Sequence, residues 1–472
     1  MSEVASPKNE ALVNKHKLKR EKRLACNYHT LSKYDIKKLL QYCYIESAGL
    51  VEGLLIASLF TGRNIGELVP PETQFQIIEG TEFGTLNSTL EFPNWSKELA
   101  LGSSHSVQSQ SPFVFLPVAI IRKIGDTAKQ DVNQIEEQAK LLLNKINTEF
   151  RTRLTLTRIK NYLSAQSKKS GLSQAEVNFI ANVPLKNHGG SSYLSLNAAE
   201  LASKHYKYIN ALMSIAELQH FNIEEICSLQ QTSLKIGSNF SVPTALISST
   251  IEELTSTIAA QQKYLKQGTA DRWHLFNCYT YYTLLLLNMG TGHRPARSPF
   301  GQLSNFDLSR QVLFIADKKN RDESGRVVPL NNSAVQQLNY YLLFLTKFFE
   351  FIRYVYPEAA TTLCESLRGR ADLLHLWIDG RLKTCSPKAI REANIPHLRA
   401  KSNCHRHWIR SAVALSIDIQ TPAIDAFMGH ENLLDESFSQ FSNLNFSNLR
   451  QIADVLEKQL CNINLTPLEV AI

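Results

Sequence analysis

Apolar residues recur at helical spacing over most of this chain. Residues three and four positions apart lie on one face of a helix, so the pattern predicts amphipathic or buried helices. It is clearest at residues 34–60, 136–150, 196–219 and 335–356. Strand signals are few: residues 311–317, a charged turn and residues 326–330 predict a β-hairpin, and residues 113–118 predict a weaker strand. We therefore expect a mainly α-helical protein with a small β-hairpin or sheet.

Length and composition narrow the class of protein. At 472 residues the chain is long enough for two or three domains with buried cores. The longest apolar stretches, LLIASLF and YTYYTLLLLNM, are too short and too interrupted to span a bilayer, and the N-terminal region is charged where a secretory signal is apolar. Its 8 cysteines lack a repeated spacing, which indicates reduced thiols rather than a disulfide framework. These features predict a cytoplasmic protein with no membrane partner.

The distribution of charge is more informative than its sum. A net charge of +8 fits many proteins that bind no polyanion. Lysine and arginine are concentrated at residues 8–23, ahead of any periodic pattern, so residues 1–27 are expected to form a basic arm. This arm either contacts nucleic acid or is a solvated tail. Residues 80–110, rich in Ser, Thr, Asn and Gly, predict a long loop or an irregular insertion.

Five basic residues in the last third of the chain give the strongest indication of chemistry. They are Arg294, Lys318, His407, Arg410 and His430. Arg294 follows Thr-Gly and precedes a proline, which predicts the first position of a helix, where backbone N–H groups favour anions. His407 and Arg410 are three apart in a helical pattern and would share one face. Because guanidinium groups bind phosphate oxygens through a bidentate fork, this set predicts a metal-free phosphate site.

Each member of the set has an expected role and a structural alternative. Lys318 on the hairpin would protonate a leaving 5′ oxygen, with Lys319 as a close alternative. His430 would hydrogen-bond the phosphate or the attacking group, and His407 would assist proton movement. Each residue also has a separate explanation: the histidines can be buried structural residues, the arginines can be solvated, and the lysine can lie in an exposed turn. The protein would then be a helical interaction scaffold without a phosphate site. Together, in this order, the five residues favour the functional interpretation.

A metal site is a weaker alternative at Cys404, His405 and His407. These closely spaced residues lack a second pair of ligands at zinc-finger spacing. No metal and no other cofactor is therefore expected.

The order and spacing of these motifs resemble the tyrosine recombinase, or phage integrase, family over roughly residues 271–460. The family's Thr-Gly-x-Arg box, hairpin lysine before Val-Pro-Leu, His-x-x-Arg box and Gly-His box are matched by Thr291, Gly292, Arg294, Lys318, His407, Arg410, Gly429 and His430. The resemblance implies site-specific recombination or integration of double-stranded DNA, as in a mobile element, by transesterification at phosphates without a cofactor. It also implies self-association as a tetramer on two DNA sites. One departure is the sequence PARSPF after the first arginine, where the family has serine and glutamate.

A larger departure concerns the nucleophile, which in the family is a tyrosine shortly after the Gly-His box. No tyrosine follows His430 in this sequence. Phe441 is the expected counterpart, in preference to Phe438, and phenylalanine keeps the ring but cannot form the phosphotyrosine bond. Three explanations stay open: an engineered change, a natural loss in a cleavage-incompetent DNA-binding accessory protein, or attack by another residue. Ser439 and Tyr193 are weak candidates for the last, so whether this chain is an enzyme depends on position 441.

The two halves of the chain share several phrases. LLIASLFTGRNIGEL around Arg63 resembles LLLLNMGTGHRPARS around Arg294, and Arg158 falls where Arg410 does. A degenerate duplication whose N-terminal copy has lost most of its site is one interpretation, and chance similarity between helices that end in Thr-Gly is the other.

The expected domains are a basic arm at 1–27, an N-terminal helical domain at 28–215, a helical linker or core-binding segment at 216–270 and a recombinase-like catalytic domain at 271–472. The N-terminal region would close around the other side of the DNA, and the helix at 448–460 would dock on a neighbouring subunit.

Overall fold

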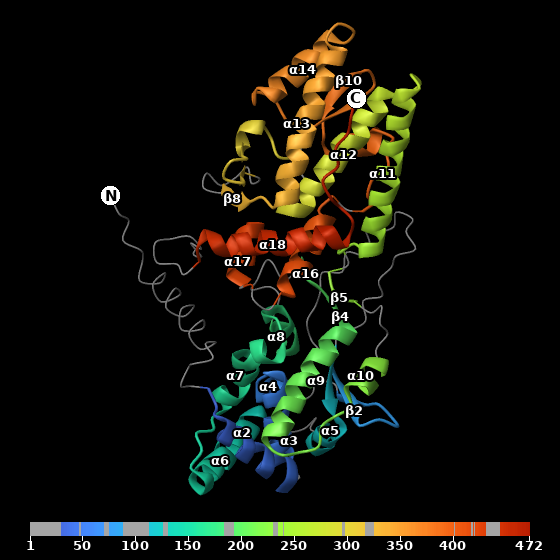
Figure 1. Ribbon diagram of the computed structural model, residues 1–472. Coiled ribbons are helices and arrows are strands. Elements are labelled where there is room, and N and C mark those ends of the chain that lie inside the picture. Colours follow the sequence, from blue (N-terminus) through green and yellow to red (C-terminus); the bar gives the residue numbers. More distant parts are fainter. Residues whose placement is uncertain are drawn as a thin grey trace, which may run out of the picture. The chain divides into compact units, whose positions relative to one another are not determined.

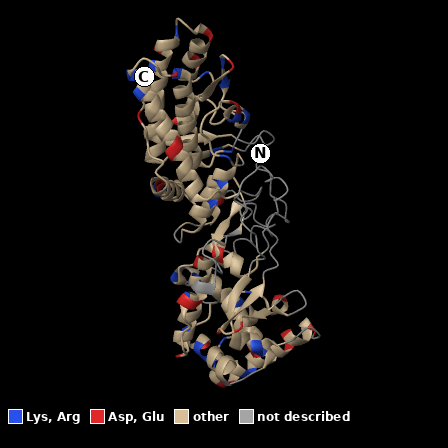
Figure 2. Cartoon of the chain, turned by 90° about the vertical axis from the view of Figure 1, so that its right-hand side faces the viewer, with Lys and Arg blue, Asp and Glu red and all other residues tan. Residues whose placement is uncertain are grey.

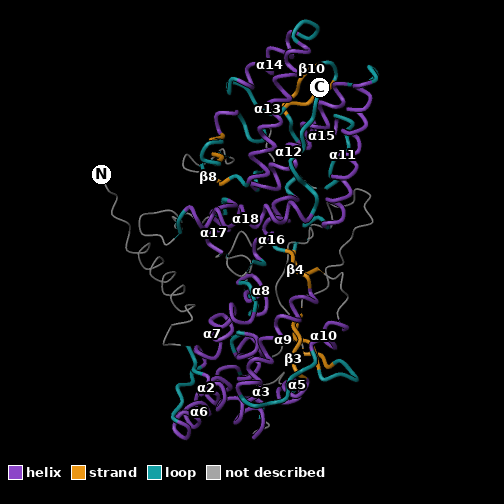
Figure 3. The backbone as a smooth tube through the Cα atoms, in the orientation of Figure 1, coloured by secondary structure: helices purple, strands orange, loops and turns teal. Residues whose placement is uncertain are grey.

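The computed structural model describes most of the chain, in two units. The described residues are 30–46, 49–69, 75–87, 113–125, 131–183, 193–229, 235–238, 240–294, 298–316, 325–400, 402–416, 419, 421–430 and 444–472. Contacts divide the chain into unit 1 (Met1–Asn239) and unit 2 (Phe240–Ile472), and each is described by itself. Both consist mainly of helices with small antiparallel sheets, which confirms the predicted mainly helical class (Figures 1 and 3). Within these described ranges, no helix has the length and apolar character needed to cross a membrane.

Unit 1 contains helices and short antiparallel strands. Its helices are α2 (Lys33–Leu40), α3 (Leu50–Thr61), α4 (Ile65–Leu68), α5 (Val118–Ile124), α6 (Val132–Phe150), α7 (Leu156–Gln166), α8 (Gln174–Ile180), α9 (Ala198–Ile215) and α10 (Ile223–Leu229), with the π-helix η1 (Gln41–Glu46) and the 3₁₀ helix η3 (Ser167–Ser170). One sheet has the order β1 (Phe75–Ile77), β2 (Phe83–Asn87) and β3 (Phe113–Pro117), and β4 (Ser195–Asn197) pairs with β5 (Lys235–Gly237). The strand predicted at 113–118 is confirmed as β3.

Helix α3 lies in the core of unit 1. Every residue of α3 from Gly53 onward is buried, and the helix packs on α5 and α7. Glycine allows this approach, because a Cβ on Gly53 would lie 2.9 Å from the Cβ of Lys123 in α5. The helix begins after Gly49 and ends at Gly62, whose φ of 70° is left-handed and favours glycine. The long helical stretch predicted there therefore consists of α2, η1 and a separate α3.

The loop predicted at residues 80–110 is wrong in part, because strand β2 lies within it. All five residues of β2 pair with β3, and three of them also pair with β1. A Cβ on Gly84, the second residue of β2, would lie 2.5 Å from the carbonyl oxygen of Gln76 in β1. A glycine required by a neighbouring strand weakens the periodic pattern by which strands are recognised in a sequence. Residues 88–112 lie outside the described residues.

Unit 2 has longer helices and two small sheets. Its helices are α11 (Thr244–Lys266), α12 (Arg272–Thr291), α13 (Asn332–Ile352), α14 (Pro357–Leu367), α15 (Pro387–Glu392), α16 (Cys404–Ala414), α17 (Thr421–Met428) and α18 (Phe446–Asn462), with the 3₁₀ helix η6 (Leu303–Asn305). Strands β6 (Phe306–Asp307), β7 (Val312–Ile315) and β8 (Arg326–Pro329) form an antiparallel sheet, and β9 (His375–Ile378) pairs with β10 (Arg381–Thr384). The predicted hairpin is confirmed, because β7 pairs with β8 and Leu313 lies opposite Val328.

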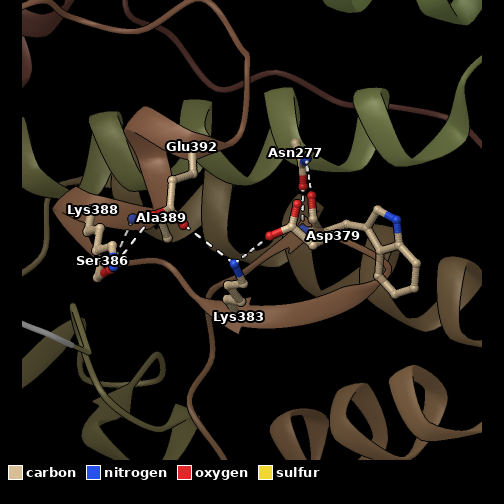
Figure 4. A network of polar contacts seen from close by, with 8 residues as sticks. Asn277, Asp379, Lys383, Ser386, Lys388, Ala389 and Glu392 are labelled. Atoms are coloured by element: carbon tan, nitrogen blue, oxygen red, sulfur yellow. Dashed lines mark hydrogen bonds and ion pairs between the residues drawn. The ribbon is translucent and has the colours of Figure 1, made fainter.

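Helix α12 is the core of unit 2. Most of its residues are buried, and it packs on α11, α13, α18 and β9. The side chain of Asn277 makes the pair of hydrogen bonds to β9 that a neighbouring strand would otherwise make. Its Nδ2 donates to the Trp377 carbonyl at 2.9 Å, and its Oδ1 accepts from the Trp377 N–H at 2.6 Å (Figure 4). The Trp377 ring stacks on Trp273 with 3.8 Å between ring centroids. In β10, Lys383 forms an ion pair with Glu392 of α15 at 3.4 Å, so the hairpin is held on both sides (Figure 4).

Replacing Asn277 by leucine is expected to lower the free energy of unfolding by about 2–3 kcal/mol, because both backbone groups of Trp377 would lose their buried partner. Urea unfolding followed by circular dichroism measures this loss. Gln336→Leu is the matched control, since the Gln336 amide donates to Tyr340 on the exposed face of α13 and its removal should cost less than about 0.5 kcal/mol. A loss no larger than that of the control would contradict the role of Asn277.

Helix α18 packs within its own unit. The resemblance predicts that residues 448–460 dock on a neighbouring subunit. The apolar side chains of α18 are instead buried in unit 2, where the helix contacts α12, α16 and α17: Leu449, Ile452, Ala453, Leu456 and Leu460. Within the single chain this apolar face is therefore covered by unit 2 itself, and docking of the helix on a neighbouring subunit stays a prediction. An amphipathic pattern predicts that a helix buries one face, but it does not identify what covers that face.

Candidate phosphate-binding site

The Thr-Gly motif forms the turn that ends α12. Thr291 Oγ1 donates to the Leu287 carbonyl at 2.7 Å, and the Gly292 N–H donates to the Asn288 carbonyl at 3.0 Å. Gly292 has a φ of 64°, and a Cβ there would lie 3.0 Å from the Sδ of Met428 in α17. Both the left-handed conformation and this close approach favour glycine. The turn thus lies against the end of α17, where the Gly-His motif follows.

Arg294 lies two residues beyond the turn and is half-buried. The prediction that it begins a helix is wrong. Arg294 itself is not helical, and the described residues that follow, from 298 onward, form a bend and a turn. Residues 295–297 lie outside the described residues. Phe300 and Gly301 have φ values of 65° and 60°, which an α-helix excludes, and the Phe300 N–H donates to His293 Nε2 at 3.4 Å. The backbone at Phe300 and Gly301 is therefore incompatible with an α-helix that continues through these residues.

Arg406 connects the motifs, although it was not among the residues predicted from the sequence. Its side chain is buried, and its Nη1 donates to the carbonyl of Gly292. Its Nη2 donates to the Met428 carbonyl at 2.7 Å and lies 2.9 Å from His430 Nε2. One guanidinium group thus joins α16 to the Thr-Gly turn and to the Gly-His turn. The available sequence signal is its position four residues before Arg410, on the same face of the predicted helix.

The contact with Arg406 determines the tautomer of His430. A guanidinium group has donors only, so Nε2 of His430 accepts, and the proton of the neutral ring lies on Nδ1. The pKa of His430 is lowered to about 2, first by burial and then by the charges of Arg406, Arg410, Arg294 and Arg326. Four positive charges on described residues of unit 2 therefore act on one neutral imidazole. We refer to these five residues as the arginine cluster.

The predicted pair on α16 has two different environments. Arg410 is buried, and its Nη1 forms an ion pair with Oδ1 of Asp425 in α17 at 2.6 Å. The positive charge of Arg410 is also one of the causes that lower the pKa of His430. His407 is buried as well, but its ring packs edge-on against Phe240 with 5.3 Å between ring centroids. The structure therefore brings Arg294, Arg410 and His430 together, whereas the His407 ring packs against the residue that begins unit 2.

Arg326 on β8 is a second member of the cluster that was not predicted. Its Nε donates to the Phe427 carbonyl at 3.1 Å, and its guanidinium group lies so close to Gly429 that a Cβ there would be 2.7 Å from Nη1. Arg326 and Arg406 thus both bind the last carbonyls of α17, where the helix dipole attracts cations. Strand alternation gives the sequence signal, because Arg326 lies on the same face of β8 as the buried Val328.

Several predicted residues cannot be placed in this site. Lys318 and Phe441 lie outside the described residues, as do the alternatives Lys319, Phe438 and Ser439. Tyr193 is described and belongs to unit 1. The roles of these residues stay predictions.

Cys404 and His405, two residues of the alternative metal site, have environments that do not suit a metal ion. Burial raises the pKa of the Cys404 thiol to about 12, which opposes the thiolate form that binds metals. His405 Nε2 donates to the His293 carbonyl at 2.5 Å. In the part of the chain that the structure describes, no group of three His, Cys, Asp or Glu residues could hold a metal ion.

Unit 1 contains the same Thr-Gly turn, but the arginine that follows it binds the end of another helix. Thr61 and Gly62 repeat the hydrogen bonds of their counterparts after α12. Arg63 is 1% exposed, and its Nε and Nη1 donate to the carbonyls of Ile180 and Asn87 at 2.9 and 3.0 Å. Ile180 is the last residue of α8, so Arg63 caps that helix, as Arg406 caps α17 in unit 2.

Comparisons with protein-family models, with curated proteins and with solved structures find no match for this chain. A function can therefore be assigned only from the chemistry of particular residues. In unit 2 the arginine cluster is the strongest basis for such an assignment.

Proposed function

We propose that this chain is a DNA-binding protein of the tyrosine recombinase type, and that the arginine cluster binds a phosphodiester of double-stranded DNA. The observation that supports this function is the gathering of arginine side chains at the Gly-His turn: Arg406 Nη2 lies 2.9 Å from His430 Nε2, and the Arg326 guanidinium group lies against Gly429. The charges of Arg294 and Arg410 act on the same histidine. Asp425 pairs with Arg410 and neutralises part of this charge. Fixed cations in a partly buried site attract a phosphate more strongly than solvated ones, because the local dielectric is lower and the groups are already oriented.

The members of the cluster have different tasks in this proposal. Arg294 is half-buried and is the member that meets the phosphate, through its guanidinium group. Nδ1 of His430 is itself buried, so His430 acts on the site through its hydrogen bond with Arg406. Arg406 and Arg410 are buried and act as positioning residues, because they hold the Gly-His turn and α17 in place. This differs from the expectation that both arginines of the sequence motifs clamp the phosphate directly.

Strand transfer would require a hydroxyl nucleophile at position 441. A tyrosine oxygen there would form a bond to phosphorus while the bond from phosphorus to the 5′ oxygen breaks. The phenolic proton would pass to a base, and Lys318 would supply a proton to the 5′ oxygen. The family's tetramer on two DNA sites belongs to this function as well.

A second candidate function is that of a cleavage-incompetent DNA-binding accessory or regulatory protein. It is favoured by the fact that no tyrosine follows His430, since Phe441 cannot form the covalent intermediate. Both candidates require the same phosphate site, so DNA binding is the first property to test.

Arg294→Gln is expected to weaken binding to double-stranded DNA by about 10- to 100-fold at moderate salt, the usual cost of losing a hydrogen bond from a charged group. The slope of log affinity against log salt concentration should decrease by about 1, because one phosphate contact is lost. Fluorescence anisotropy with a labelled duplex over a series of salt concentrations measures both quantities.

Arg272→Gln is the matched control for this experiment. Arg272 begins the helix that ends at the Thr-Gly turn, about 30 Å away at 1.5 Å per residue, and its guanidinium group stacks on the Phe351 ring. Equal affinities of the two folded variants would contradict the proposed site. If the unaltered protein bound no duplex at any salt concentration, a helical interaction scaffold would be supported instead.

A further inference from the structure

A second surface, in unit 1, combines cations with aromatic rings. Its residues lie on α2 and η1, towards the end of α6, on the chain that leads into α7 and on the first turn of α7. We refer to it as the α2–α6 surface: Lys33, Tyr34, Lys37, Lys38, Tyr42, Lys145, Phe150, Arg151, Arg153 and Arg158. Helix α2 contacts both α6 and α9 (Figure 1). Basic and acidic residues are mixed over the molecule (Figure 2), so this surface is defined by its contacts rather than by net charge.

Hydrogen bonds hold the segments of this surface together. The Tyr34 hydroxyl donates to the Phe150 carbonyl at 3.1 Å, which joins α2 to the end of α6. The Arg153 N–H donates to the buried carboxylate of Asp35 at 3.0 Å, and Arg158 Nη1 donates to the Arg153 carbonyl at 2.8 Å. The basic side chains are therefore attached to backbone that is fixed in one arrangement.

Several cations of the surface are available to an anionic partner. Lys33, Arg151 and Arg153 are exposed and form no ion pair with any residue that the structure describes. Lys37 does form one, with Glu217 at 2.6 Å, but Glu217 is 73% exposed in its side chain. Surface pairs of this kind contribute little free energy, so a phosphate can replace the carboxylate at small cost.

Aromatic rings lie between these cations. Lys38 Nζ is 4.9 Å from the ring centroid of Phe150 and 5.9 Å from that of Tyr34, and Lys145 Nζ is 5.7 Å from that of Tyr42. Tyr34 is 51% exposed. It lines a pocket of about 360 Å³ together with Lys33, Lys37, Ser214 and Ile215. Surfaces on which rings and cations alternate suit single-stranded nucleic acids, because bases stack on the rings and phosphates pair with the cations.

We infer that the α2–α6 surface binds a single-stranded segment of nucleic acid, with a base on the Tyr34 ring and phosphates at Lys33, Arg151 and Arg153. A duplex presents bases that are already stacked on each other, so an exposed ring beside a pocket contributes little to duplex binding, whereas it suits an unpaired base. This inference goes beyond the proposed function and concerns the other unit of the chain.

Fluorescence anisotropy with a labelled oligothymidylate of about 16 nucleotides tests this inference. The triple variant Lys33→Gln, Arg151→Gln, Arg153→Gln is expected to bind it at least about tenfold more weakly, with a salt slope smaller by about 2. Tyr34→Ala is expected to lose about tenfold in affinity, the effect of removing one stacked base contact. Tyr34→Phe keeps the ring and removes the hydroxyl bond to Phe150, so it should retain the affinity and separate stacking from folding.

The matched control replaces three exposed cations elsewhere in unit 1 by glutamine: Arg122, Lys140 and Lys169. It is expected to bind oligothymidylate as the unaltered protein does. Duplex binding should persist in the triple variant, because that property is assigned to the arginine cluster in unit 2, and this separates failure of the inference from failure of the proposed function.

Three results would overturn the inference. The first is an equal affinity of the triple variant and its control for oligothymidylate, and the second is the absence of any oligothymidylate binding by the unaltered protein. The third is a triple variant that loses binding to duplex or to phosphatidylserine vesicles while its binding to oligothymidylate is unchanged.

Discussion

A Phe441→Tyr protein is expected to form a covalent adduct with a nicked suicide duplex, whereas the unaltered chain is expected to form none. The phosphate site is proposed to lie in unit 2, and the substitution supplies the hydroxyl that transesterification requires. The nick allows the released DNA fragment to diffuse away, so the phosphotyrosine intermediate accumulates instead of reversing. A denaturing gel with labelled DNA detects the adduct as a band of lower mobility.

Two variants determine whether such an adduct arises from the proposed chemistry. Phe438→Tyr places a hydroxyl three residues earlier and is expected to give no adduct. Adding Arg294→Gln to Phe441→Tyr should slow adduct formation by about 100-fold or more, the usual effect of removing a preorganised donor to a reacting oxyanion. If Phe441→Tyr bound duplex DNA but formed no adduct, recombination would be excluded as its function and the accessory protein would be the better proposal.

The parts of the fold that depend on local periodicity can be predicted from the sequence. Helices α6, α9 and α13 lie where the apolar pattern places them, because each buries one face. The strand β2 and the close packing of α3 on α5 cannot be predicted in this way. They depend on Gly84 and Gly53, whose small size matters only because β1 and α5 approach them in space.

The candidate site could be predicted only in part, because its centre depends on contacts between distant segments. Arg294, Arg410 and His430 could be selected from motif spacing. Arg406 could not, since its donors reach carbonyls at the ends of α12 and α17 that only the fold brings together. The geometry of α16 is consistent with this outcome. Around the helix axis, Arg406 lies about 40° from Arg410 in one direction, whereas His407 lies about 60° from Arg410 in the opposite direction.

The two Thr-Gly turns show how one residue changes the use of a shared motif. In unit 1, Arg63 follows the glycine directly, and its side chain is directed to the end of α8. In unit 2, His293 follows the glycine directly, and its carbonyl accepts from His405. Arg294 comes one residue later and is half-buried. Similar local sequences therefore produce a helix cap in one unit and a member of the arginine cluster in the other.

Both units are expected to lose stability when the pH falls from about 6.5 to 4.5. Burial is the largest cause that lowers the pKa of three histidines: His205 to about 4, His405 to about 3 and His430 to about 2. In the unfolded chain their pKa is about 6.5, so below this pH the unfolded state binds protons that the folded state does not. Their contribution to the free energy of unfolding is thus fully present above pH 6.5. As the pH falls from 6.5 to the pKa of each histidine in the folded protein, that histidine's contribution decreases by about 1.4 kcal/mol per pH unit.

His205→Gln isolates one of these contributions. His205 Nε2 donates to the Phe60 carbonyl at 2.9 Å, and a glutamine amide can make the same hydrogen bond without a titratable group. The variant should be within about 1 kcal/mol of the unaltered protein at pH 7, and the pH dependence of unit 1 should be smaller by about 1.4 kcal/mol per pH unit. Urea unfolding at several pH values measures both, with His220→Gln as a control at an exposed histidine. If His205→Gln left the pH dependence of unit 1 unchanged, protonation of His205 would not be coupled to the unfolding of unit 1.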